Sequence, residues 1–136
     1  GSEMCIRDRF ENILVTVEQG VYRKSSAWWP HINKANCIER TEELIRSVGL
    51  IDQSFSFASD LTRYEQRCLE IARGLAMDPQ ILLIDEPADG MNTQQQHALA
   101  GLLKDVCKGA LTLVVTSAGS DPFVLICDRT VHLSTH

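Results

Sequence analysis

Two adjacent carboxylates, Asp85 and Glu86, follow the apolar run 81–84 and precede Pro87. One carboxylate that positions Mg²⁺ beside another that orients a water molecule is the arrangement that phosphoryl transfer needs. The apolar run predicts a strand buried on both faces of a parallel sheet, and α/β proteins bind ligands beyond the carboxyl ends of such strands. Proline disfavours a helical conformation at Glu86, which we expect to be extended. The alternative interpretation is an acidic pair in a solvated turn.

The elements around this pair can be predicted from periodicity and caps. Thr62 and Glu65 form a capping-box pattern that opens a strong helix, which ends at Asp78 and Pro79. Thr93 is expected to cap the helix that follows the acidic pair. The other expected elements are helices over 10–19 (stopped by Gly20), 36–48 (ended by Gly49) and 121–127, and strands over 111–115 (buried) and 130–133.

The first half of the chain is therefore helical and the second half alternates strands and helices, which predicts an α/β fold. We expect a helical subdomain over 10–77 and the sheet-bearing part over 78–136. Residues 4–9 read MCIRDR, which resembles the translation of a transposon end used in sequencing libraries. We therefore interpret residues 1–9 as a tag and adapter-derived segment, and expect the native sequence to be the back portion of a longer gene.

Composition excludes several classes of protein. The 136 residues are 44% hydrophobic and 23% charged, as in globular domains. A net charge of -5 and a pI near 5.3 argue against nucleic-acid binding. The five cysteines include no CxxC pair, so neither a zinc site nor a disulfide framework is indicated. No apolar run approaches the roughly 20 residues that cross a bilayer.

The stretch 61–92, LTRYEQRCLEIARGLAMDPQILLIDEPADGMN, resembles the region between the signature helix and the Walker B strand of ABC transporter ATPases. It is most similar to the subunits that energise branched-chain amino acid uptake, whose D-loop typically reads AGMN. Segments such as ELIRSVGL and CDRTVHL are similar to flanking parts of the same family, and the resemblance covers about residues 10–133. It implies part of a P-loop NTPase core preceded by a helical subdomain.

The resemblance also implies roles for individual residues. Asp85 would hold Mg²⁺ through water, Glu86 would be the general base, and Asn92 would close the D-loop. Residues 61–65 would be the signature motif, which contacts the γ-phosphate of ATP held by a partner subunit. A helix N-terminus suits an anion, and Thr62 can both supply the motif's hydroxyl and act as the N-cap.

Three departures from the family pattern indicate a degenerate site. Arg63 and Tyr64 stand where the signature motif has glycines, and their side chains are expected to crowd an approaching phosphate. Ala118 stands ten residues before Asp128, where the family has its switch histidine, and alanine cannot bond a phosphate. No G-x-x-x-x-G-K-[ST] phosphate loop occurs in the 136 residues.

These features predict a truncated, degenerate nucleotide-binding subunit of an ABC transporter that does not hydrolyse ATP alone. Mg²⁺ and ATP are the family's cofactors, and we expect neither to be bound by this chain. The alternatives are a pseudo-ATPase that pairs with a competent subunit or a membrane partner, and an unrelated α/β enzyme that uses the same carboxylates.

The resemblance further implies a permease as partner and a place on the cytoplasmic face of the membrane. In the family fold the phosphate-loop strand lies between the strands expected at 111–115 and 130–133. Without it, either those two strands pair directly or a second copy covers the gap, and we expect a homo-oligomer, most simply a dimer.

Overall fold

The computed structural model describes residues 6–24, 33–50, 62–118 and 122–133. These ranges form the helices α1 (Ile6–Lys24), α2 (Lys34–Ser47), α3 (Arg63–Ala76) and α4 (Thr93–Val106), the strands β1 (Ile81–Asp85) and β2 (Thr112–Thr116), and the 3-10 helix η3 (Val124–Ile126). The two strands run parallel, so the predicted α/β class is confirmed.

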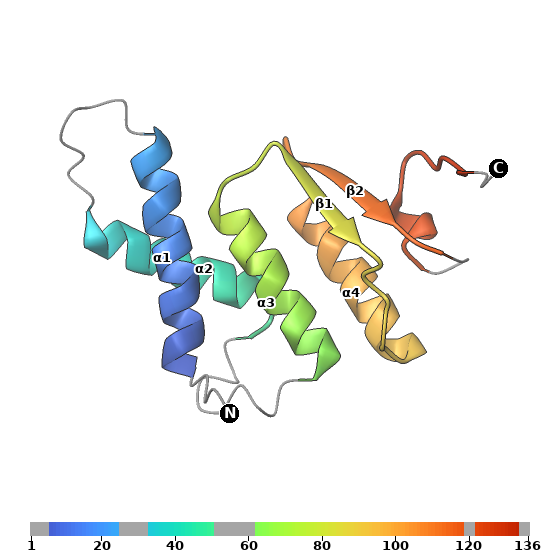
Figure 1. The fold of residues 1–136 in the computed structure, drawn as a ribbon, viewed down its shortest axis with the longest axis horizontal. Coiled ribbons are helices and arrows are strands. Elements are labelled where there is room, and N and C mark those ends of the chain that lie inside the picture. The colour runs from blue at the N-terminus through green and yellow to red at the C-terminus, as the bar shows by residue number, and fades with distance from the viewer. Residues whose placement is uncertain (1–5, 25–32, 51–61, 119–121, 134–136) are drawn as a thin grey trace.

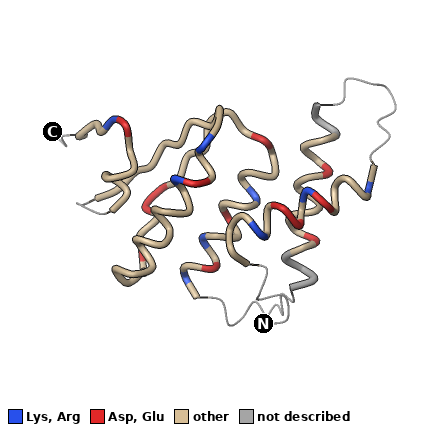
Figure 2. Tube along the Cα trace, turned by 180° about the vertical axis from the view of Figure 1, so that it is seen from behind, with Lys and Arg blue, Asp and Glu red and all other residues tan. Residues whose placement is uncertain are grey.

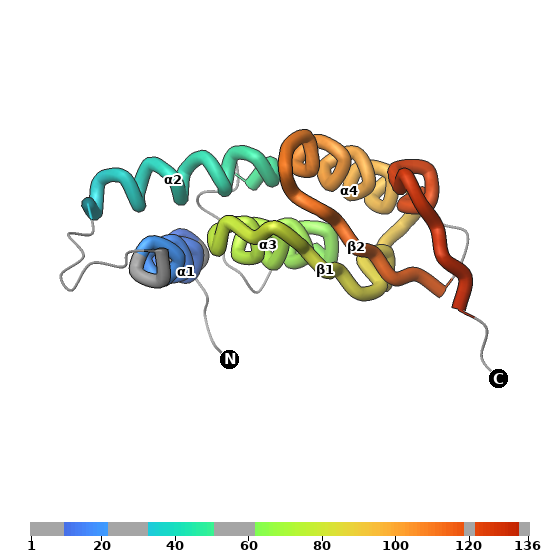
Figure 3. The backbone as a smooth tube through the Cα atoms, turned by 90° about the horizontal axis from the view of Figure 1, so that it is seen from above, coloured from blue at the N-terminus to red at the C-terminus, as the bar shows by residue number. Residues whose placement is uncertain are grey.

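Helix α3 joins the two ends of the molecule. It packs against α1 and α2 on one side and against α4 on the other, and it lies between the α1–α2 pair and the strands (Figure 1). Seen from above, α2 and α4 form one row and α1 and α3 a second (Figure 3). A single hydrophobic cluster runs through all of these helices and reaches Ile84 of β1 and Phe123 beside η3.

The caps of α2 and α3 follow from local sequence. Asn33 caps α2, and Gly49 follows that helix with a φ of 72°. In α3, the backbone N–H of Thr62 donates to Glu65 Oε2 at 2.7 Å, and the N–H of Glu65 donates to Thr62 Oγ1 at 3.3 Å. Both bonds are present, so the predicted capping box is confirmed. It could be predicted because its two residues are only three positions apart.

The cap of α4 differs from the prediction by one residue. Asn92, not Thr93, is the N-cap: its side chain accepts from the Gln95 N–H at 2.9 Å, and the Gln95 side chain accepts from the Asn92 N–H at 3.1 Å. Asparagine caps helices at least as well as threonine. Thr93 becomes the first helical residue.

Gly20 does not end the first helix, which continues to Lys24. Its buried position explains the glycine: a Cβ there would lie 3.1 Å from the carbonyl oxygen of Ala76, at the end of α3. The residue therefore permits a close approach of two helices. The expectation of a helix stop at Gly20 was wrong. The glycine is needed for a contact with a residue far away in the sequence, which the local pattern does not reveal.

Among the described residues, helices cover one face of the sheet and leave side chains of the other face exposed. Ile81 and Leu83 of β1 are 64% and 67% exposed, and Val114 of β2 is 42% exposed, whereas Ile84 is buried. Leu82 also points to the covered side, where its Cδ1 lies close to Gly74 of α3. The expectation of a strand buried on both faces is therefore wrong for this chain.

The part after β2 departs most from the expectations. A helix was predicted over 121–127, and among the residues described there only Val124–Ile126 form a short 3-10 helix. Residues 130–133 form no strand, and the described sheet consists of β1 and β2 alone. Direct pairing of 130–133 with the second strand is therefore not observed. Within the described ranges, no helix is long and apolar enough to cross a bilayer.

Candidate functional site

The two carboxylates lie at the carboxyl end of β1. The parallel register pairs Asp85 with Thr116, the last residue of β2, so residues 31 positions apart meet at one edge of the sheet. Asp85, Glu86 and Thr116 are all exposed. Ligands of α/β proteins bind at this edge, and the position agrees with the sequence-based prediction.

Thr116 connects both carboxylate-bearing residues. Its hydroxyl donates to Asp85 Oδ1 and accepts from the backbone N–H of Glu86 at 3.3 Å. The same N–H also donates to the backbone carbonyl of Thr116 at 3.1 Å. One side chain from the neighbouring strand thus orients the first carboxylate and fixes the peptide group that follows it.

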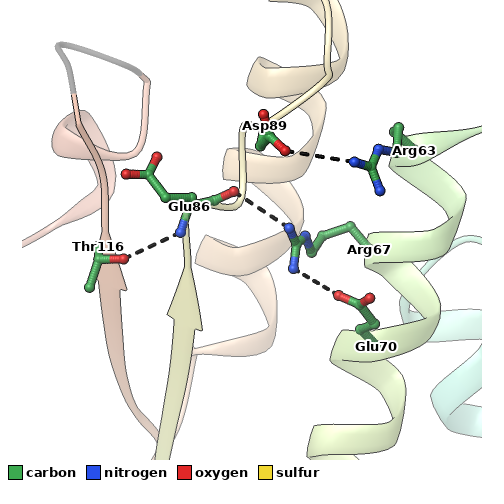
Figure 4. Close-up of polar contacts among 6 residues, drawn as sticks. All are labelled: Arg63, Arg67, Glu70, Glu86, Asp89 and Thr116. Atoms are coloured by element: carbon green, nitrogen blue, oxygen red, sulfur yellow. Dashed lines mark hydrogen bonds and ion pairs between the residues drawn. The ribbon is translucent and has the colours of Figure 1, made fainter.

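Glu86 is not extended, contrary to the expectation from Pro87. Its φ angle is 42°, which is the left-handed region that residues with a Cβ rarely adopt. Such a conformation costs about 1–3 kcal/mol and persists only where the surroundings hold it. The side chain of Glu86 is exposed, and its carboxylate points away from α3 (Figure 4).

A guanidinium group from α3 lies on the other side of Glu86. Arg67 Nη2 donates to the carbonyl oxygen of Glu86 at 3.5 Å, a long hydrogen bond. Glu70, one turn further along α3, holds the same guanidinium at 2.8 Å. Because the Arg67 side chain is only 26% exposed, its charge is screened less than that of a surface arginine.

Arg63 turns away from the N-terminus of its own helix. Its guanidinium pairs with Asp89 at 3.7 Å, and its stem lies so close to Gly90 that a Cβ there would be 3.2 Å from Nε (Figure 4). Both partners are largely exposed, so the pair is worth about 0–1 kcal/mol. The geometry therefore directs Arg63 toward the loop after β1.

Tyr64 is also turned away, toward the core. Its hydroxyl donates to the Cys68 thiol one turn along α3, and burial raises the pKa of Tyr64 to about 12. Burial likewise raises the pKa of Cys68 to about 11, although the bond from Tyr64 opposes that rise. Both groups are therefore neutral at ordinary pH and serve packing.

The capping residues at the start of α3 bond to one another, because the Glu65 N–H donates to the Thr62 hydroxyl oxygen and the Thr62 N–H donates to Glu65 Oε2. Besides the Thr62 N–H, the Thr62 hydroxyl donates to Glu65 Oε2 at 2.9 Å. A carboxylate thus occupies the helix N-terminus, where the resemblance places a phosphate. Asn92 is engaged as the cap of α4. Ala118 is exposed and lies two residues beyond the end of β2.

The donor set at the strand ends fits a hard cation. Mg²⁺ is commonly held by one or two carboxylates and completes its shell with waters and phosphate oxygens. Asp85 supplies an exposed carboxylate and Thr116 an adjacent hydroxyl oxygen. In the described ranges no three residues of the types His, Cys, Asp and Glu form a metal-binding group, so the chain alone offers a partial coordination shell.

Thr116 and Arg67 were missed in the sequence analysis. Thr116 could have been found, because the last residue of a second parallel strand must lie beside the end of the first. Arg67 offered a weaker signal: it stands four residues after Arg63, on the same face of the predicted helix. Neither the hydrogen bond of Arg67 to a backbone carbonyl nor the left-handed Glu86 leaves a pattern in the sequence.

No protein-family model matches the chain. Similar sequences are found among curated ATP-binding proteins. A methionine import ATP-binding protein of Brucella abortus is 33% identical over 101 residues, which cover 74% of this chain and 27% of that protein. A lipoprotein-releasing system ATP-binding protein of Syntrophus aciditrophicus is 36% identical over 85 residues, covering 61% and 38%. The glutamine transport ATP-binding protein of Escherichia coli is 28% identical over 85 residues, covering 62% and 35%.

Solved structures of similar fold come from the same class. The ATP-binding cassette MJ1267 of an ABC transporter superposes with a TM-score of 0.70 at 20% identity, covering 93% of this chain and 50% of that one. The cbiO1 protein of Clostridium perfringens, described as part of the ABC transporter complex cbiONQ, gives a TM-score of 0.65 at 20% identity, covering 82% and 44%.

The fold matches part of these solved ATP-binding proteins of ABC transporters. The homologues are ATP-binding subunits of ABC transporters, and the chain is similar to one part of such a subunit. The chain spans between about a quarter and two fifths of the length of these curated relatives.

Proposed function

We propose that the chain is a degenerate nucleotide-binding subunit of an ABC transporter that does not hydrolyse ATP by itself. The observation that carries the proposal is the position of Asp85 and Glu86 at the carboxyl end of a parallel strand, in a sequence whose relatives are ATP-binding subunits. In the role that the resemblance implies, Asp85 with Thr116 beside it would hold Mg²⁺ and Glu86 would orient water, but the chain lacks the groups that bring the triphosphate to them. The 136 residues contain no glycine-rich phosphate loop, whose backbone N–H groups would grip a triphosphate.

A second reason for weak nucleotide binding lies in the signature helix. The Thr62 donors point to the Glu65 carboxylate, and a carboxylate at this place repels a phosphate. Arg63 offers a cation nearby, but it pairs with Asp89. Because Arg63 and Tyr64 are turned away from this end of the helix, the Glu65 carboxylate, more than crowding by their side chains, is the proposed cause of weak phosphate binding.

Calorimetric titration with Mg-ATP tests this proposal directly. We expect no saturable heat at ligand concentrations up to about 1 mM, which corresponds to a binding free energy weaker than about -4 kcal/mol. A dissociation constant in the micromolar range, lost in Asp85→Asn, would contradict it. Thr112→Val serves as a control, because Thr112 lies on the same strand as Thr116 at its far end.

The proposed solute and the proposed partner are inferred from the relatives. Two of them are named for methionine import and glutamine transport, and the residues ADGMN (88–92) resemble the D-loop of branched-chain amino acid importers. Amino acid uptake is thus the proposed process, with a membrane permease as partner and a location at the cytoplasmic face of the membrane.

If the chain instead acts as a pseudo-ATPase, adding it to a hydrolysing ABC subunit should change that subunit's turnover.

We also propose that the chain forms a homodimer through the open side of its sheet. Ile81, Leu83 and Val114 are exposed there, and the only charged residue of the two strands is Asp85, at the end of β1. Most of the charged residues lie on the helices (Figure 2). Five-residue strands are about 17 Å long and about 5 Å apart, which is too small for the about 800 Å² per partner that a stable interface buries. The interface therefore includes the exposed apolar residues after β2, which are Val124, Leu125, Val131 and Leu133.

A further inference from the structure

The backbone of Glu86 needs an explanation beyond its own sequence. Its φ of 42° is unfavourable for a residue with a Cβ, and Pro87 restricts it further. A strained backbone at a functional residue persists where neighbouring groups fix the adjacent peptide units. The question is which groups hold this one.

The peptide unit before Glu86 is fixed from β2. Its N–H is shared between the carbonyl and the hydroxyl oxygens of Thr116, at 3.1 and 3.3 Å. The hydroxyl in turn donates to Asp85, so its orientation is set by the carboxylate. Rotation of Glu86 to a negative φ would require this arrangement to be broken or rebuilt.

The peptide unit after Glu86 is fixed from α3. Arg67 donates to the Glu86 carbonyl at 3.5 Å and is itself held by Glu70 at 2.8 Å. Pro87, which follows, has no N–H and cannot stabilise this region by donating a bond. Two different elements therefore hold the two sides of Glu86, and its carboxylate points away from α3 (Figure 4).

We propose that Thr116 and Arg67 are positioning residues that keep Glu86 in its left-handed conformation and so direct its carboxylate. Thr116 is the stronger of the two, because its contacts are shorter and include Asp85. The proposal rests on the proposed function only in assigning Glu86 the water-orienting role. Its test uses no nucleotide, so the two can fail separately.

The test follows Glu86 by NMR in the isotopically labelled chain. The intraresidue NOE between its amide proton and Hα, which is stronger at positive φ because the two protons lie closer together, reports φ together with their coupling, and the exchange rate of its amide reports the bonds to Thr116. In Thr116→Val we expect loss of the strong intraresidue NOE of positive φ and faster amide exchange, by at most the roughly tenfold that one hydrogen bond supplies, because the carbonyl of residue 116 can still accept from this N–H. Thr116→Ser, which keeps the hydroxyl, should restore both values, and Thr112→Val should leave both unchanged.

Two further variants keep the proposal testable if Thr116→Val does not fold. Arg67→Met removes the guanidinium and keeps the apolar stem, and it should also weaken the intraresidue NOE of Glu86. In a Glu86→Gly background, Thr116→Ala should lower the urea midpoint less than in the parent chain, because glycine adopts positive φ unaided. An unchanged φ in folded Thr116→Val or Arg67→Met, or an equal midpoint loss in both backgrounds, would overturn the proposal.

Discussion

At the scale of single residues, the left-handed backbone of Glu86 reverses the usual ranking of alanine and glycine. A Cβ in that region costs about 1–2 kcal/mol. We therefore expect Glu86→Gly to be more stable than Glu86→Ala by about 1 kcal/mol in urea unfolding. Glu39, which is exposed within α2, is the matched control, because alanine should exceed glycine there by about 1 kcal/mol. The same ranking at both positions would contradict the assigned φ.

The Tyr64–Cys68 pair makes stability depend on alkaline pH. Both pKa values are raised by burial, to about 12 and about 11 from 10.0 and 9.0. The folded state therefore binds more protons than the unfolded state in this range, and stability is lost as pH rises. The contribution of this pair to the free energy of unfolding is complete below pH 9 and is lost between pH 9 and 12.

A spectrophotometric titration checks this directly. Tyr22→Phe leaves Tyr64 as the only tyrosine, so its ionisation can be followed by absorbance. We expect a midpoint near 12 in the folded chain and near 10 in urea. Equal midpoints in the two states would show that Tyr64 is not buried against Cys68.

At the scale of elements, Gly20 and Gly101 form a matched pair of helical glycines. A Cβ at Gly101 in α4 would meet nothing within 4 Å, whereas one at Gly20 in α1 would lie 3.1 Å from the Ala76 carbonyl. Gly101→Ala should therefore stabilise the chain by about 0.5–1 kcal/mol, and Gly20→Ala should fail to do so or destabilise it. Thermal unfolding measures both, and an equal gain in both variants would exclude the close helix contact.

Sequence patterns predicted those elements whose causes are local. The capping box of Thr62 and the strand ending at Asp85 could be located because the determining residues are within a few positions. Gly20 was misassigned because its neighbour is at the end of another helix. The strand predicted at 130–133 is absent from the described sheet, and the local pattern of an apolar run does not specify whether it pairs with a strand far away in the sequence. The same distinction between local and distant causes applies to the site. The carboxylates were identified from local sequence, but identifying Thr116 requires knowledge of how the two strands pair.

At the scale of the whole molecule, the open sheet face predicts association. Leu83 is 67% exposed at the centre of this face, so Leu83→Lys should convert a dimer into a monomer. Light scattering at low micromolar concentration measures this. Val15, also apolar and 49% exposed but on α1, provides the control, since Val15→Lys should leave the mass unchanged. A monomeric parent chain would reject the dimer.

The proposed function depends most directly on whether the chain hydrolyses ATP. Phosphate release from Mg-ATP should be measured for the parent chain and for Glu86→Gln, which keeps the shape of the side chain and removes the proposed base. We predict no turnover above background in either protein, because no phosphate loop is present in the 136 residues and Glu65 occupies the start of the signature helix. Turnover by the parent chain that disappears in Glu86→Gln would contradict the account.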